Sequence, residues 1–193
     1  MARLILGVDE AGRGPLAGPV AVGVVAVPEG FDFNLIDGVR DSKQMTELGR
    51  EIWFERLRVL EREAGVRYAV TFSSALVIDR FGITRAVRRA VFRGVWVLAP
   101  EPQGVRVLLD GLLKAPHQYE QETIVGGDAS EPLIALASIA AKVRRDRLMR
   151  RHAVRYPDYG FEEHKGYGTK KHYEALTKLG PTTIHRRTFL KLK

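Results

Sequence analysis

The chain has 193 residues and no cysteine, which excludes disulfide bonds, thiolate zinc sites and cysteine nucleophiles. Its length fits a single domain. No apolar run approaches the roughly 18 to 20 residues that a membrane-spanning helix needs, and the first residues lack the layout of a signal peptide. We therefore expect a globular protein of the cytoplasm.

Positive charge is concentrated near the C-terminal end of the chain. The formal net charge is +8, and residues 142–193 hold 15 of the 31 basic side chains but only 5 of the 23 acidic ones. Charge of one sign that is clustered in this way attracts polyanions. The distribution predicts a nucleic-acid partner, although a basic surface that serves only solubility is the simpler alternative.

The first half of the chain predicts two strands, a helix and a third strand. Residues 4–9 and 16–27 are apolar and rich in β-branched side chains, and the short connection between them favours an antiparallel pair. Residues 28–37 form a loop rich in Pro, Gly, Asp and Asn, and residues 45–63 follow a helical pattern. A third strand is predicted over residues 66–72.

The second half predicts more strands and helices. Apolar side chains at four-residue spacing predict one helix over residues 76–98, with a separate short first turn as an alternative, and two prolines then break the chain. Strands are expected at 105–111 and 120–125, a long helix at 132–155 and a short one, capped by Thr169, at 169–179. This order indicates an α/β sheet with at least one antiparallel pair and helices packed on it.

Four acidic residues lie at or just after the ends of predicted strands, each with a glycine nearby: Asp9, Glu10, Asp110 and Asp128. Strand ends converge at sites in α/β sheets, and grouped carboxylates repel one another unless cations lie among them. Oxygen ligands alone select hard ions such as Mg²⁺ or Mn²⁺. Taken singly, Asp110 is better explained by a turn and Asp128 by a helix N-cap. Taken together, beside a basic tail, the acids favour a metal site.

Several motifs resemble the signatures of bacterial ribonuclease HII, in order along almost the whole chain. They are Asp9-Glu10-Ala11-Gly12-Arg13-Gly14-Pro15, Asp41-Ser42-Lys43, Leu109-Asp110-Gly111, Gly127-Asp128, residues 137–147 and His164-Lys165-Gly166-Tyr167-Gly168-Thr169. The resemblance implies a ribonuclease H-like fold, with a mixed five-stranded sheet and flanking helices. Residues 1–155 would form the catalytic domain, and residues 156–193 a helical segment packed on it as one structural unit.

The resemblance also implies an activity. Such enzymes cleave the RNA strand of RNA–DNA hybrids and nick DNA on the 5′ side of an embedded ribonucleotide, leaving 3′-hydroxyl and 5′-phosphate ends. Asp9, Glu10 and Asp110 would bind two ions of Mg²⁺ or Mn²⁺, and Asp128 would complete the set.

Substrate contacts follow from the same resemblance. The backbone of Gly12-Arg13-Gly14 would read the ribose 2′-hydroxyl, the group that separates RNA from DNA, and Tyr167 would stack under the neighbouring sugar. Further contacts to the nucleic-acid backbone are expected from Arg13, Lys43, Ser138, Lys142 and Lys165. For Lys142, compensation of the helix dipole or a solvated helix face is an equal alternative. Without the resemblance, Tyr167 is better explained as a core or surface aromatic residue in a glycine-rich loop.

Other residues receive structural interpretations. The histidines show no metal-ligand pairing and are interpreted as structural: His117, His152, His164, His172 and His185. Asp146 is expected to pair with neighbouring arginines or to order the site without binding metal.

The chain lacks the C-terminal extension with which some relatives bind a sliding clamp, which argues against that partner, and no zipper-like helix suggests an oligomer. We expect a monomer.

Two alternative functions stay open. A resolvase or integrase of the same fold would use similar acids on DNA without needing a 2′-hydroxyl. A protein that only binds nucleic acid would use the basic tail, but it would gain nothing from four carboxylates in its groove.

Overall fold

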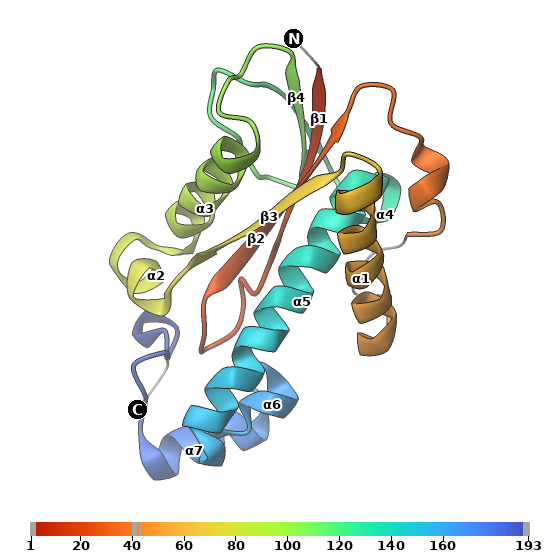
Figure 1. Ribbon diagram of the computed structural model, residues 1–193. Coiled ribbons are helices and arrows are strands. Elements are labelled where there is room, and N and C mark those ends of the chain that lie inside the picture. The colour runs from red at the N-terminus through yellow and green to blue at the C-terminus, as the bar shows by residue number, and fades with distance from the viewer. Residues whose placement is uncertain (1–2, 40–41, 43, 191–193) are drawn as a thin grey trace.

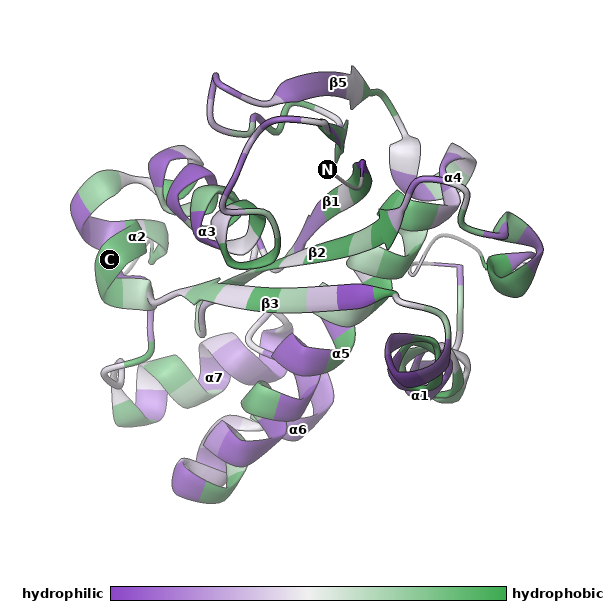
Figure 2. Ribbon diagram, turned by 45° about the horizontal axis from the view of Figure 1, so that its top comes forward, coloured by the Kyte–Doolittle hydropathy of each residue, from purple (hydrophilic) through white to green (hydrophobic). Residues whose placement is uncertain are grey.

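A computed structural model describes residues 3–39, 42 and 44–190 of the chain. Its centre is a five-stranded sheet in the order β3-β2-β1-β4-β5; Figure 1 labels the first four strands and Figure 2 labels β5. The strands are β1 (Leu4–Ala11), β2 (Val20–Pro28), β3 (Arg67–Ser73), β4 (Val105–Asp110) and β5 (Glu120–Ile124). The predicted phosphate contact Lys43 lies outside the described residues, as does Asp41 of the same motif.

The sheet is mixed, as predicted. Strand β1 runs antiparallel to β2 and parallel to β4, so it holds the centre of the sheet. The remaining pairs are β2 with β3, antiparallel, and β4 with β5, parallel. Strands β1, β4 and β5 therefore end at the same edge.

The second strand begins later than predicted, at Val20 rather than at residue 16. Gly18 has a φ of 86°, and a Cβ there would lie 2.3 Å from the sulfur of Met149. Ala17 instead forms an isolated bridge with His185. Residues 16–19 thus contact the C-terminal segment and do not extend the sheet.

Helices cover both faces of the sheet. On one face lies α3 (Ile83–Leu98), preceded by α2 (Ala75–Phe81); on the other lie α1 (Glu47–Glu63) and the long α5 (Pro132–Arg155), which crosses β1 and β2 (Figure 1). Strand side chains alternate between the two cores: Leu6 and Val8 face α3, whereas Val25 and Val27 face α5. The fully buried strand β2 reads as a continuous apolar run because both its faces are covered.

The predicted single helix over residues 76–98 is wrong in one respect, because Gly82 divides it into α2 and α3. Gly82 has a φ of 78°, outside the helical range, and its N–H closes α2 by donating to the carbonyl oxygen of Ile78 at 2.8 Å. Only glycine adopts this conformation without strain.

The C-terminal segment packs against the second half of α5. It contains α6 (Phe161–His164), α7 (Lys170–Leu179) and the short 3-10 helices Pro157–Tyr159 and Arg187–Phe189. Thr169 caps α7 as predicted, accepting from the N–H of His172. Figure 2 shows α6 and α7 mostly hydrophilic and β2 mostly hydrophobic, and most residues of α6 and α7 are exposed or partly exposed. Among the described residues, none of the helices has the length and apolar character that crossing a bilayer would require.

Candidate active site

Three carboxylates from separate elements meet where the parallel strands end. One oxygen each of Asp9, Asp110 and Asp128 lies within 4.8 Å of the others. Asp9 comes from β1, Asp110 ends the adjacent β4, and Asp128 lies in the single-turn helix α4 (Gly127–Ser130) that follows β5. The N–H of Asp128 also donates to Oδ1 of Asp110 at 3.4 Å.

Strand alternation explains which acids join this group. Asp9 is on the α5 side of β1 and makes a hydrogen bond with Ser138 of that helix. Glu10 has the opposite parity, because β1 continues to Ala11 before the chain turns. Its carboxylate pairs with Nη1 of Arg13 at 3.2 Å. Glu10 therefore lines the same cleft without belonging to the three-carboxylate group.

The electrostatics of the group favour a bound cation. Asp9 is only 4% exposed, and burial, helped by the charges of Glu10 and Asp110, raises its pKa to about 8. Hydrogen bonds from Ser138 and from the N–H of Glu10 oppose this shift. A divalent cation would stabilise the ionised carboxylate, and an all-oxygen donor set fits Mg²⁺ or Mn²⁺.

A cleft of about 430 Å³ holds most of the predicted site residues. Its lining includes nine of them: Asp9, Glu10, Gly12, Arg13, Gly14, Asp110, Ser138, Lys142 and Tyr167. Ser42 and Arg50 complete one wall, where the hydroxyls of Ser42 and Ser138 lie 2.8 Å apart and Arg50 donates to the carbonyl oxygen of Ser42 at 2.9 Å. Residues far apart in the sequence thus surround one space.

The two predicted lysine contacts on described residues have different surroundings. Lys142 lines the cleft and forms an ion pair with Asp146 at 2.8 Å, while its burial lowers its pKa. The ammonium of Lys165 lies apart, donating to the carbonyl oxygen of Glu162 and lying 3.9 Å from Glu47. Lys165 is not among the residues that line the cleft.

Of the two interpretations of Asp146, the structure contradicts pairing with the neighbouring arginines and is compatible with a role in ordering the site. Asp146 is 3% exposed and pairs with Lys142 one helical turn earlier, not with the neighbouring arginines. The adjacent Arg147 points to α1, where it pairs with Glu51 at 2.5 Å. The two neighbours differ because successive residues of a helix face different directions. Asp146 holds Lys142 from behind the cleft.

Two buried arginines hold the Gly-Arg-Gly turn, a role that the sequence did not predict. Arg186 donates to the carbonyl oxygens of Gly12 and Arg13, each at 2.7 Å. Arg145 donates from Nε to the carbonyl oxygen of Pro19 at 2.9 Å and packs against Gly12, where a Cβ would lie 2.0 Å from that Nε. For Arg186 the only available signal was its position within the basic tail, which does not distinguish a buried arginine from an exposed one. Arg145 also lies in the motif of residues 137–147, but no contact with the turn was predicted for it.

The histidines of the C-terminal segment form one cluster behind Tyr167. Thr182 donates its N–H to Nδ1 of His185 at 2.8 Å, so the proton of a neutral His185 sits on Nε2, facing Nε2 of His172 at 3.0 Å. His172 then donates from Nδ1 to the carbonyl oxygen of Tyr167 at 2.9 Å. The structural interpretation fits His172 and His185, which are buried.

A sequence model of the ribonuclease HII family, described as "Ribonuclease HII", matches residues 6–192. The chain belongs to this family. It is 48% identical over 186 residues to the ribonuclease HII of Endomicrobium trichonymphae, which covers 96% of this chain and 84% of that relative. Identity to the Bacillus velezensis protein is 46%, over 97% of this chain and 69% of that relative.

Solved structures of the family agree with the fold. Ribonuclease HII of Archaeoglobus fulgidus, determined in complex with PCNA, is 25% identical with a TM-score of 0.79, over 98% of this chain and 97% of that one. Ribonuclease H2 of Pyrococcus horikoshii is 27% identical with a TM-score of 0.77, over 96% and 93%. The ribonuclease H-like fold is confirmed, and membership of the ribonuclease HII family makes the chain a nuclease that cleaves RNA in RNA–DNA hybrids.

Proposed function

We propose that this enzyme also nicks duplex DNA on the 5′ side of a single embedded ribonucleotide, leaving 3′-hydroxyl and 5′-phosphate ends. One observation carries the proposal: the carboxylates of Asp9, Asp110 and Asp128 converge within 4.8 Å beside a cleft that the Gly-Arg-Gly turn and Tyr167 also line. In this proposal the carboxylates bind the metal ions needed for cleavage, and the turn and the tyrosine distinguish ribose from deoxyribose.

The metal requirement follows from the donor set. We assign Asp9, Asp110 and Asp128 as the residues that would hold Mg²⁺ or Mn²⁺, and Glu10, which lines the same cleft, as a further carboxylate that would bind these ions. When bound, two such ions activate water and stabilise the departing O3′ in phosphodiester cleavage. Ser138 holds Asp9 in place through the hydrogen bond between their side chains.

The groups proposed to contact the ribose are the glycine backbone of the turn and the ring of Tyr167. Nothing lies within 4 Å of a Cβ placed on Gly14, so this part of the turn is open to a sugar. Tyr167 is 43% exposed in the cleft, and the hydrogen bond from His172 fixes its backbone. In this proposal a 2′-hydroxyl contacts the turn and the tyrosine, which no deoxyribose can do.

Phosphate binding and assembly complete the proposal. Lys142 and Arg13 line the cleft as cations, and Asp146 keeps the ammonium of Lys142 charged by opposing its desolvation. All groups named come from one chain, so we propose that the enzyme acts as a monomer on a single nucleic-acid duplex.

Cleavage of a DNA duplex with one ribonucleotide tests the proposal, beside an all-DNA duplex and with Mg²⁺ or Mn²⁺ present. The wild type should give one nick 5′ to the ribonucleotide, and Asp110→Asn should lose at least about 100-fold in rate. Asp158→Asn, on the exposed 3-10 helix after α5, is the matched control and should keep full activity. Cutting of the all-DNA duplex would instead indicate a resolvase-like nuclease, and binding without cutting a protein that only binds.

Tyr167→Phe tests the ribose contact separately. It should lower the rate on the single-ribonucleotide duplex while leaving the melting temperature unchanged. Tyr173→Phe is the matched control, since Tyr173 is 44% exposed and Tyr167 43%. Equal rates for the two variants would remove Tyr167 from the recognition of the 2′-hydroxyl.

A further inference from the structure

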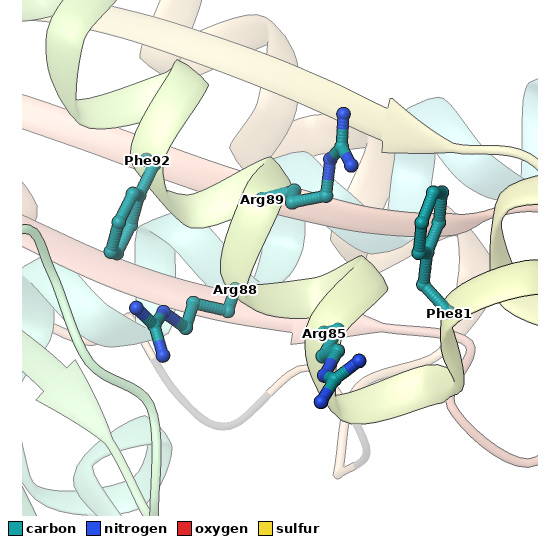
Figure 3. Close-up of a pocket in the computed structure, with 5 residues that line it drawn as sticks. All are labelled: Phe81, Arg85, Arg88, Arg89 and Phe92. Carbon is teal, nitrogen blue, oxygen red and sulfur yellow. The ribbon is translucent and has the colours of Figure 1, made fainter.

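A second cluster of cations lies on α3, across the sheet from α5. Arg85, Arg88 and Arg89 surround a surface hollow of about 310 Å³, together with Phe81 and Phe92 (Figure 3). Residues at i, i+3 and i+4 share one face of a helix, so the three guanidinium groups belong to one surface. We call these three residues the α3 arginine face.

The charges of this face are not neutralised within the described part of the chain. Arg85, Arg88 and Arg89 make no ion pair and no hydrogen bond there. The only acid in residues 75–98 is Asp79, and its carboxylate accepts from the N–H groups of Arg187 and Thr188 at 2.9 and 3.0 Å. The α3 arginine face therefore keeps its full positive charge.

Aromatic rings hold two of the guanidinium groups in place. Arg89 lies over the ring of Phe81 at 5.0 Å, and Arg88 over the ring of Phe92 at 5.2 Å. A stacked guanidinium keeps its N–H edges available for anions, and less side-chain freedom is lost when one binds. This arrangement suits phosphate oxygens, which guanidinium groups bind in a bidentate manner.

The basic surface continues toward the loop after β4. Arg88 and Phe92 also line a second hollow of about 450 Å³, shared with Lys114 and His117. Strand β5 contributes the neutral Gln121 and Thr123 to this hollow. Its acids Glu120 and Glu122 have the opposite parity and pair with Arg106.

From these observations we infer that the α3 arginine face binds the phosphate backbone of duplex nucleic acid outside the cleavage site. A row of unneutralised cations complements the regular charge of a duplex. A duplex fits better than a single strand, because guanidinium groups already cover the rings of Phe81 and Phe92 that unstacked bases would need. The inference goes beyond the proposed function and does not depend on cleavage.

Binding in EDTA, without divalent cations, tests the inference. The triple variant R85Q/R88Q/R89Q is titrated with an all-DNA duplex of about three helical turns at several salt concentrations. We expect about tenfold weaker binding than the wild type and a salt slope lower by about 2 to 3, because each phosphate that the variant no longer binds lowers the slope by about one unit. R85K/R88K/R89K keeps the charges and should keep most of the affinity and slope.

The matched control R58Q/R62Q/R67Q removes three exposed arginines from α1 and β3 and should change affinity less than twofold. Cleavage of a short hybrid should be equal in all variants, which also verifies folding. The inference is overturned if the α3 variant and this control bind duplex alike, or if single-stranded DNA loses more affinity than duplex. Loss of binding to phosphatidylserine vesicles with duplex affinity unchanged would also overturn it, in favour of a lipid surface.

Discussion

The guanidinium of Arg186 donates from Nη2 to the carbonyl oxygen of Gly12 at 2.7 Å, joining residues 174 positions apart. The same side chain donates to Arg13 and, from Nε, to Gly18 at 2.9 Å. A fully buried arginine near the C-terminal end thus holds the turn that forms one wall of the cleft. The C-terminal segment is a structural support of the candidate active site.

Arg186→Lys should destabilise the protein by about 2 to 4 kcal/mol, because one ammonium cannot serve three carbonyl oxygens and leaves buried acceptors without donors. The rate on a single-ribonucleotide duplex should fall as the turn loosens. Thermal unfolding and single-turnover cleavage measure the two effects. Arg187→Lys is the control, because the side chain of Arg187 is exposed; equal melting temperatures for both variants would contradict this role of Arg186.

The two glycines of the turn should respond differently to alanine. Gly12 has a φ of 90°, and its Cβ would lie 2.0 Å from Nε of Arg145, so Gly12→Ala should cost at least about 2 kcal/mol of stability as well as activity. Gly14→Ala meets nothing within 4 Å and should leave the melting temperature unchanged. If the backbone at Gly14 approaches the sugar, the cleavage rate of the Gly14→Ala variant should still fall. An unchanged rate in Gly14→Ala would place the ribose elsewhere.

Asp9→Asn should stabilise the metal-free protein while abolishing cleavage. Burial raises the pKa of Asp9 to about 8, above the 3.8 of a free carboxyl, so the stability that protonated Asp9 contributes is lost as the pH rises from about 4 to 8. At pH 7 in EDTA the variant should be more stable by about 2 kcal/mol or more. Mg²⁺ should raise the melting temperature of the wild type only; an equal rise in the variant would remove Asp9 as a ligand.

Acid should weaken the histidine cluster behind Tyr167. Burial, with the nearby His172, lowers the pKa of His185 to about 4 from its usual 6.5. Because the pKa is lowered in the folded protein, neutral His185 contributes to the free energy of unfolding above pH 6.5. This contribution, about 3 kcal/mol in total, is lost as the pH falls to 4. His185→Gln should be less stable at pH 7 and show a shallower loss between pH 6.5 and 4. The control His117→Gln, at an exposed position, should show the same dependence of stability on pH as the wild type. The same dependence in His185→Gln would contradict a role for the histidine cluster.

Most of the fold was predictable because local patterns carry it. Hydrophobic runs and turn residues predicted all five strands and the long helix α5, and the motifs predicted the family. The misplaced start of β2 and the break at Gly82 have one physical reason: both depend on a glycine with positive φ, and sequence does not show whether a glycine uses that freedom.

The sequence by itself predicted which residues would carry the chemistry: the acids at the strand ends, the Gly-Arg-Gly turn and Tyr167. Only the tertiary structure decided how they relate, because each relation depends on packing between distant segments. It brought Asp9, Asp110 and Asp128 together while strand alternation turned Glu10 to the other side. The tertiary structure also buried Arg186 beneath the turn and left the α3 arginine face open to solvent. The burial of an arginine depends on the elements packed around it and not on its neighbours in sequence.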